Sequence, residues 1–155
     1  MGLPIPVAAI ARCLQCPLVV DAQAVASLPV SKGAYALVLR IPGRVEVTVR
    51  TNAHALPAGW YVYVGSARGP GGLRARLARH FRADRKPHWH VDALTAVANR
   101  LYALALVAGS ECEVVRRLAE LPATSFPIAG FGSSDCADCR AHLLRWHARP
   151  DAHRA

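Results

Sequence analysis

YVYVGSARGPGGLRARLARHFR, residues 61–82, reads as the end of a strand, a glycine-rich loop and a helix. The apolar run 60–64 has the length and the aromatic and β-branched composition of a buried strand. The glycines and proline of 69–72 predict a turn. Apolar residues then recur every four positions, at Leu73, Leu77 and Phe81. This spacing predicts one apolar stripe of an amphipathic helix over 72–82.

Three other segments have the patterns of strands. Residues 33–41, GAYALVLRI, form a nearly continuous apolar run that ends at a Pro-Gly turn. In 45–50, valines alternate with polar residues, as in a strand with one face in water. Residues 101–108, LYALALVA, predict a further strand. Because short links join 33–41, 45–50 and 60–65, we expect an antiparallel meander in which the first two strands form a hairpin.

Together these patterns predict an α+β fold, a small antiparallel β-sheet flanked by helices. The expected helices lie near 72–82, 92–99, 111–121 and 135–147. We expect one domain over 27–149, preceded by an extension of uncertain structure at 1–26 and followed by a tail at 150–155.

Composition restricts the function classes. With 155 residues, 53% of them hydrophobic, the chain can pack one core. It has neither an apolar run of about 18 residues nor the basic start and cleavage site of a signal peptide, so we expect a cytoplasmic protein that does not bind a membrane. The formal net charge of +9 favours a polyanionic partner, and nucleic acid is the leading candidate. No small organic cofactor is indicated.

The strings GAY at 33–35 and YVG at 63–65, then Arg76 with His80 four residues later, then a helical Glu, occur in this order. This order resembles the signature of the GIY-YIG nuclease superfamily, over residues 30–147. The later strings HWHVD and FGSSDCADC resemble an uncharacterised bacterial and archaeal branch of it. The interval between the two tyrosines is longer than in the best-known members, and the strand predicted at 45–50 would account for the extra residues.

The resemblance implies a Mg²⁺-dependent DNA endonuclease that hydrolyses phosphodiester bonds. It implies that Tyr35 and Tyr63 face the scissile phosphate and orient or deprotonate water. It also implies that Arg76 neutralises charge in the transition state, that His80 assists as a proton acceptor, and that a helical Glu holds Mg²⁺. We expect these residues to line one concave site, with His80 on its rim.

Glu111 is the expected Mg²⁺ ligand. Ser110 can cap a helix that begins at Glu111. At 100° per residue, Glu111 lies about 40° from Val115 and about 20° from Leu118 on the apolar face, whereas Glu113 faces solvent. An inward carboxylate suits Mg²⁺, which takes one or two carboxylates plus substrate phosphates. The alternative is that Glu111 only complements the positive end of its own helix.

Several basic and aromatic residues are candidates for contact with nucleic acid. They are Arg68, Arg74, Arg79, Lys86, His88 and His90. HWHVD at 88–92 has other interpretations, since His88 and His90 with Asp92 could bind a metal, or Asp92 could cap a helix. The superfamily usually has a late Asn that supports the site, and none follows Asn99. Ser133 or Ser134 could substitute for it, and a non-catalytic nucleic-acid-binding module of the same fold is the alternative function.

The cysteines leave three interpretations open. CLQC at 13–16 and CADC at 136–139 have the spacing of zinc ligands and could form a four-Cys site. Cys112, Cys136, Cys139 and His142 could form a structural zinc site instead. The favoured interpretation has no zinc, because Cys136 and Cys139 would lie on the buried face of the helix predicted at 135–147. A small zinc hydrolase that uses the HxH pair or cysteine ligands is the third function hypothesis.

Overall fold

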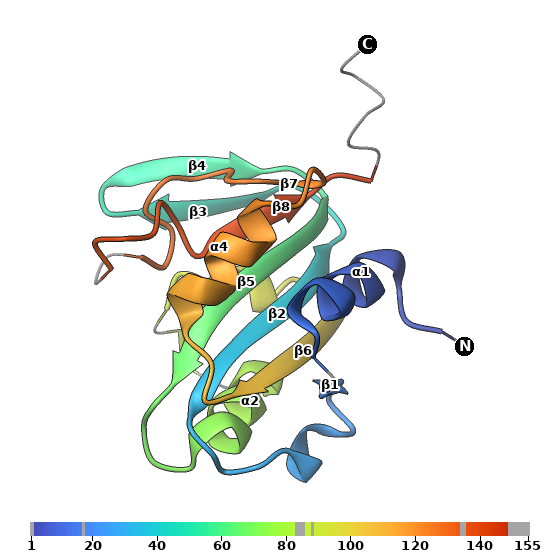
Figure 1. The fold of residues 1–155 in the computed structure, drawn as a ribbon. Coiled ribbons are helices and arrows are strands. Elements are labelled where there is room, and N and C mark those ends of the chain that lie inside the picture. The colour runs from blue at the N-terminus through green and yellow to red at the C-terminus, as the bar shows by residue number, and fades with distance from the viewer. Residues whose placement is uncertain (1, 17, 83–85, 88, 134–135, 149–155) are drawn as a thin grey trace.

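A computed structural model describes residues 2–16, 18–82, 86–87, 89–133 and 136–148. Six strands form one antiparallel sheet in the order β1-β6-β2-β5-β8-β7 (Figure 1). Their bounds are β1 Val19–Val20, β2 Gly33–Ile41, β5 Gly59–Ala67, β6 Arg100–Val107, β7 Thr124–Ser125 and β8 Leu143–Trp146. Helices flank this sheet, which confirms the predicted α+β class.

The central strand β2 explains why its sequence is an almost unbroken apolar run. It pairs with β5 on one side and with β6 on the other along nearly its whole length. Every residue of β2 except Arg40 is buried. A strand covered on both faces shows no alternation of polar and apolar residues, so the sequence predicts its position but not its partners.

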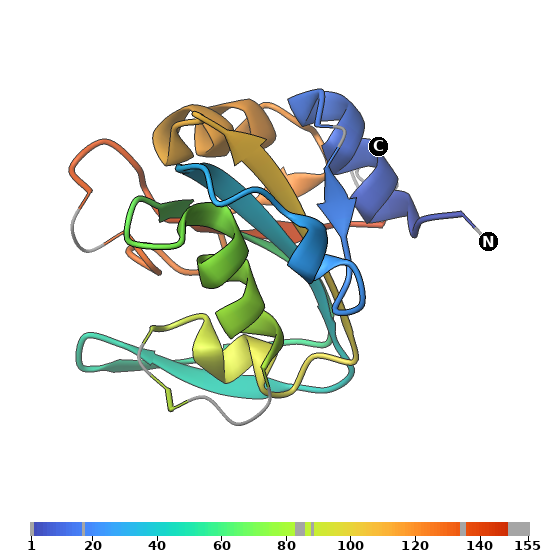
Figure 2. The same cartoon turned by 90° about the horizontal axis from the view of Figure 1, so that it is seen from below.

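One face of the sheet packs against two helices, α1 (Ile5–Leu14) and α4 (Glu111–Ala119) (Figure 1). The other face is covered by α2 (Gly72–Phe81), the short α3 (Asp92–Thr95), the 3-10 helix η1 (Val25–Ser27) and a separate hairpin (Figure 2). The hairpin consists of β3 (Val45–Val49) and β4 (Asn52–Leu56). The helices predicted at 72–82 and 111–121 are confirmed, and the one predicted at 92–99 is shorter than expected.

The predicted hairpin between 33–41 and 45–50 is wrong. Residues 45–49 do form a strand, but β3 pairs with β4, which lies in the predicted link between 45–50 and 60–65. Both edges of β2 are occupied by β5 and β6, so β2 has no edge to offer β3. Instead, the hairpin lies on the same side of the sheet as α2 and α3, and the apolar side chains of β3 are buried in the core there.

The helix predicted at 135–147 is also wrong. Its described part, 136–147, contains no helix, and β8 pairs with β5 there. Leu143 and Leu144 are both fully buried but in opposite cores, one on each face of the sheet. Neighbouring residues buried on opposite faces are typical of a strand covered on both sides.

The segment 1–26, for which no structure was predicted, contributes to the core. In α1, Pro6, Val7, Ile10 and Leu14 are buried, and the last three belong to the same core cluster as α4 and the sheet. A helix with one buried stripe is stabilised mainly by the burial of that stripe. We therefore describe α1 as a layer of the domain.

Ile10→Ala tests this description, with Ile5→Ala as the matched control on the same helix. Ile10 is 0% exposed and Ile5 is 79% exposed. Ile10→Ala should lower the free energy of unfolding by about 2–5 kcal/mol in urea denaturation, because it leaves a cavity. Ile5→Ala should change it by less than about 0.5 kcal/mol. Equal, small effects of the two substitutions would show that α1 does not pack on the sheet.

Candidate functional site

Several strand ends meet at one end of the sheet. Gly33 at the start of β2 pairs with Ala67 at the end of β5 and with Val107 at the end of β6. The start of β8 lies at the same end, because Leu143 pairs with Tyr63 of β5. Residues near these ends therefore converge although they are far apart in sequence.

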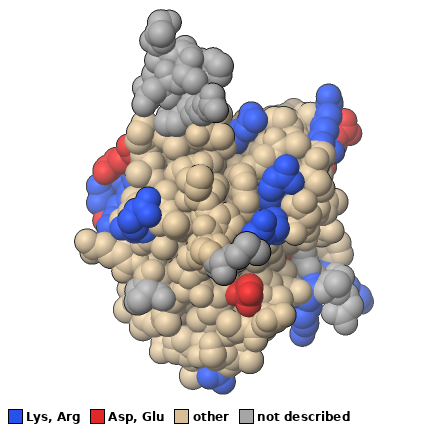
Figure 3. Space-filling view, turned by 90° about the vertical axis from the view of Figure 1, so that its right-hand side faces the viewer, with Lys and Arg blue, Asp and Glu red and all other residues tan. Residues whose placement is uncertain are grey.

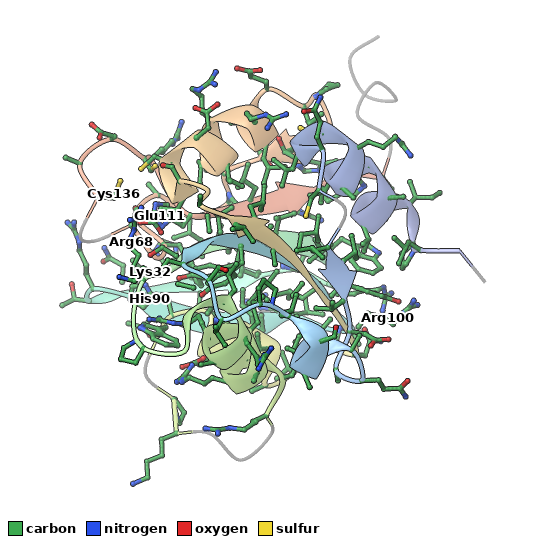
Figure 4. All side chains as sticks on the ribbon, turned by 60° about the horizontal axis from the view of Figure 1, so that its bottom comes forward. Lys32, Arg68, His90, Arg100, Glu111 and Cys136 are labelled. Atoms are coloured by element: carbon green, nitrogen blue, oxygen red, sulfur yellow. The ribbon has the colours of Figure 1, made fainter. Side chains whose placement is uncertain are left out.

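A pocket of about 300 Å³ opens there. The residues that line it include Tyr35, Tyr63, Arg76, His90, Glu111 and His142. Figure 4 shows Glu111, His90 and Cys136 on one side of the molecule together with Lys32 and Arg68, and Arg100 on the opposite side. The structure thus brings together the two tyrosines, the arginine and the glutamate that the sequence analysis selected.

Tyr35 lies across Gly65, its partner in the β2–β5 ladder. A Cβ atom at Gly65 would lie 2.4 Å from the Tyr35 hydroxyl and 2.5 Å from Cζ, so this position requires glycine. Tyr63 lies two residues before Gly65 and therefore projects from the same face of the sheet. The register alone places both rings together.

His80 was expected on the rim of the pocket, but it lies behind Tyr35. Its side chain is buried, and its Nε2 lies 2.8 Å from the Tyr35 hydroxyl. The rings are tilted with centroids 5.3 Å apart. His80 thus contacts the pocket through Tyr35.

Both tyrosines are neutral phenols at neutral pH. Burial raises the pKa of Tyr35 far above its ordinary value. Burial, and then the Glu111 carboxylate, raise the pKa of Tyr63 to about 12. They can therefore donate and accept hydrogen bonds in the pocket without carrying charge.

Trp89 of HWHVD organises the arginines of α2. The guanidinium carbons of Arg76 and Arg79 lie 4.5 and 3.9 Å from the centroid of its ring. Arg79 also donates two hydrogen bonds to Asp92, at 3.1 and 3.0 Å, and Asp92 accepts one from the backbone N–H of Trp89. Arg79 was a candidate for contact with nucleic acid, but its side chain is partly buried and held by Asp92. This network fixes Arg76 at the pocket.

The HxH metal site is not assembled among the described residues. His88 lies outside them. The Asp92 carboxylate is bound by Arg79, and Asp92 is the first residue of α3 and not its cap. His90 Nδ1 accepts a hydrogen bond from the Gly132 N–H at 3.2 Å, which places His90 in the wall of the pocket.

The other predicted basic contacts are dispersed. Arg68 is exposed just beyond the end of β5, and Lys32, not singled out from the sequence, is exposed just before the start of β2. Arg74 donates to the Leu28 carbonyl, and Lys86 is exposed. On the face that carries α1 and β1, Lys and Arg side chains are spread singly over a largely neutral surface (Figure 3). Arg76 thus lines the pocket, and Arg68 and Lys32 lie on the same side of the molecule (Figure 4).

Glu111 begins α4, and its side chain is 30% exposed. Its Oε2 lies 3.7 Å from Nδ1 of His142. Glu113 faces solvent, as the helical spacing predicted, and it also pairs with Arg116. Ser110 is at the N-cap position as expected, but its side chain makes no capping hydrogen bond.

A cluster of possible metal ligands adjoins the pocket. The side-chain ligand atoms of Cys112, Cys136, Cys139 and His142 all lie within 4.8 Å of one another. This set could hold a metal such as zinc. The sequence had not favoured zinc binding by this set. The favoured interpretation, in which Cys136 and Cys139 lie on the buried face of a helix, is wrong because the described residues 136–147 form no helix.

The four-Cys site does not form. Cys13 contacts the Arg117 carbonyl, and Cys16 contacts the carbonyls of Leu18 and Ala105. Neither belongs to the metal-ligand cluster, which is the one cluster of its kind found in the described ranges.

Sequence reasoning missed the position of His142 beside Glu111 and the place of Gly132 in the pocket wall. The regular spacing Cys136-x2-Cys139-x2-His142 was a sequence signal that could have indicated the position of His142. A Cβ atom at Gly132 would lie 2.8 Å from a ring carbon of Tyr63, and its φ is +70°. Ser133, a candidate substitute for the late Asn, is buried with its hydroxyl 3.5 Å from the Arg140 carbonyl and does not line the pocket, and Ser134 is outside the described residues.

Residues 34–155 match the family described as "Domain of unknown function DUF123". The chain belongs to this family. The comparisons with curated proteins and with solved structures give no match. Among the described residues, no helix has the length and apolar character needed to cross a membrane. The matched range contains every residue of the DUF123 chain that lines the pocket and the whole metal-ligand cluster.

Gly65→Ala tests the contact between Tyr35 and Gly65, with Gly69→Ala as the control. Gly69 has open space where its Cβ would be. Gly65→Ala should lower the free energy of unfolding by about 1–3 kcal/mol, because the Tyr35 ring must move. Gly69→Ala should change it by less than about 0.5 kcal/mol. Urea denaturation of both variants gives the comparison, and an unperturbed Gly65→Ala protein would contradict the close approach.

Proposed function

We propose that this chain is a Mg²⁺-dependent DNA endonuclease that hydrolyses phosphodiester bonds by GIY-YIG-type chemistry. The observation that carries the proposal is the convergence of Tyr35, Tyr63, Arg76 and Glu111 on one pocket. They supply a metal ligand, a cation and two hydrogen-bonding phenols, which are the groups that phosphodiester hydrolysis needs.

Glu111 would hold Mg²⁺. Its carboxylate is partly exposed at the pocket and has no Lys or Arg within ion-pair distance in the described part of the chain. Mg²⁺ prefers oxygen ligands and keeps several waters, so one carboxylate and a substrate phosphate suffice to bind it. The ion would polarise the phosphoryl oxygen and stabilise the leaving oxygen.

Tyr35 and His80 would activate the attacking water. With the His80 proton on Nδ1, Nε2 accepts the Tyr35 O–H, and the Tyr35 oxygen can then accept a hydrogen bond from water in the pocket. As the water attacks phosphorus, its proton passes to the Tyr35 oxygen and the phenol proton passes to His80. A neutral phenol backed by an imidazole can thus act as a base without first becoming a phenolate.

Arg76 and Tyr63 would stabilise the transition state. Arg76 is oriented by Trp89, so its guanidinium is held in place before charge develops on the phosphate. Tyr63 is neutral and donates its O–H to a phosphate oxygen. Both lie in the pocket wall with Glu111.

Charge favours DNA over a small phosphodiester. The net charge is +9. Gly33 at the start of β2 pairs with Ala67 at the end of β5, and the exposed residues Lys32 and Arg68 lie next to this pair in the chain. Phosphates on either side of the cleaved bond could bind these side chains. Duplex affinity should therefore fall as salt rises.

The test is cleavage of nicked, branched and supercoiled DNA with Mg²⁺ by the wild type, Glu111→Gln and Arg76→Ala. Glu113→Gln is the matched control, because Glu113 lies on the same helical turn but faces solvent. Glu111→Gln and Arg76→Ala should each lower the cleavage rate by about a hundredfold or more, while most duplex affinity is retained. Glu113→Gln should cleave at the wild-type rate.

Two results would contradict the proposal. One is wild-type cleavage by Glu111→Gln. The other is a wild-type protein that binds DNA but cleaves none of these substrates with Mg²⁺, which would favour the non-catalytic module.

A further inference from the structure

We infer that Cys112, Cys136, Cys139 and His142 bind a structural zinc ion, and that through His142 this ion fixes the orientation of Glu111. The zinc site stands on its own geometry. The second part rests on the proposed function, since it assigns a purpose to the orientation of Glu111.

The distances suit a tetrahedral ion. A Zn–S bond of about 2.3 Å gives an edge of about 3.8 Å between two sulfur ligands of a tetrahedron. The Sγ atoms of Cys112 and Cys136 are 3.3 Å apart, and no two ligand atoms of the set are more than 4.8 Å apart. A disulfide needs about 2.05 Å, so these thiols are spaced for a shared ion and not for a bond to each other.

His142 has one ring nitrogen available for the ion. Its side chain is 4% exposed, and its buried Nε2 has no hydrogen-bond partner in the described residues. Its other nitrogen, Nδ1, faces Glu111. A buried polar atom without a partner is costly, and coordination of zinc through Nε2 removes that cost.

The backbone holds His142 in place before any ion binds. The His142 N–H donates to the Phe131 carbonyl, and the His142 carbonyl accepts from the Val64 N–H, both at 2.8 Å. The second bond ties the ligand to β5 beside Tyr63, and the first ties it to the segment between β7 and β8. The CxxC segment then only has to bring two thiols to a fixed imidazole.

The ligand set indicates a structural ion. Three thiolates and one imidazole complete the four-coordinate shell of zinc and leave no position for water. Soft thiolates also select zinc against Mg²⁺, whereas the carboxylate oxygen of Glu111 suits Mg²⁺. The two metal positions would therefore be chemically distinct although Glu111 and Cys112 are consecutive residues.

Zinc would act on Glu111 in two ways. It ties the first turn of α4, through Cys112, to the loop before β8. It also fixes the tautomer of His142, because a ring bound through Nε2 carries its proton on Nδ1, 3.7 Å from Glu111 Oε2. A small rotation makes this a hydrogen bond of the carboxylate–histidine–zinc kind that orients groups in metal sites. His142 is thus a positioning residue for Glu111.

Metal analysis of the purified protein tests the site itself. The wild type should contain about one zinc ion per chain, Cys139→Ser should lose it, and Cys13→Ser, the control from the other CxxC pair, should keep it. The Co²⁺-substituted wild type should show the visible absorption of a tetrahedral thiolate site, a readout that requires no variant to fold. Absence of bound metal, a Cys112–Cys136 disulfide in its place, or equal zinc loss in Cys13→Ser would overturn the inference.

His142→Cys separates zinc binding from positioning. It keeps four ligands, so zinc should remain, but it removes the Nδ1–H that faces Glu111. The Mg²⁺ concentration for half-maximal cleavage should rise about tenfold or more. An unchanged Mg²⁺ requirement would overturn the positioning role.

A tautomer measurement needs no cleavage assay. Long-range ¹H–¹⁵N spectra of the zinc-loaded wild type should show His142 protonated on Nδ1 and bound through Nε2. Binding through Nδ1 would overturn the coupling to Glu111. Zinc with this tautomer but no cleavage would refute the proposed function and leave the zinc site, whereas full cleavage by a protein stripped of zinc would refute the positioning role of zinc and leave the proposed function.

Discussion

The pairing of β2 with β5 at Tyr35 and Gly65 is the constraint on which the pocket depends. The missing side chain at Gly65 lets the Tyr35 ring lie across the neighbouring strand, where its hydroxyl meets His80. The same register puts Tyr63 on the same face, and the antiparallel order brings the ends of β6 and β8 to this end of the sheet. A shift of one residue would turn one of the tyrosines to the other face.

Two supporting structures surround this pair. On one side, Asp92 binds Arg79, and the Trp89 ring stacks with both Arg79 and Arg76, so Trp89 and Asp92 help to hold an arginine at the pocket. On the other side, the cysteine cluster adjoins Glu111 through consecutive residues of α4 and through His142. Arg76 is thus held by neighbours that do not need to touch a substrate, and Glu111 lies beside His142 of the cysteine cluster.

The sequence predicted the parts of this arrangement that depend on local pattern. The strand at 33–41, the helices at 72–82 and 111–121 and the inward direction of Glu111 follow from periodicity. It could not predict what β2 pairs with, because a strand covered on both faces carries no sign of its neighbours. For the same reason β8 was predicted as a helix, which hid the approach of Cys136 and Cys139 to His142 and Cys112. The role of Trp89 was missed because a stacking contact between distant segments leaves no periodic signal.

The central claim is that Glu111 holds a hard divalent ion beside Arg76 and the two tyrosines. Anomalous diffraction from crystals grown with Mn²⁺ in place of Mg²⁺ and a short DNA duplex tests it most directly. We predict a manganese peak at the Glu111 carboxylate, with a phosphate between that ion and Arg76. A duplex bound elsewhere, or a manganese ion in the crystal that does not contact Glu111, would contradict the account.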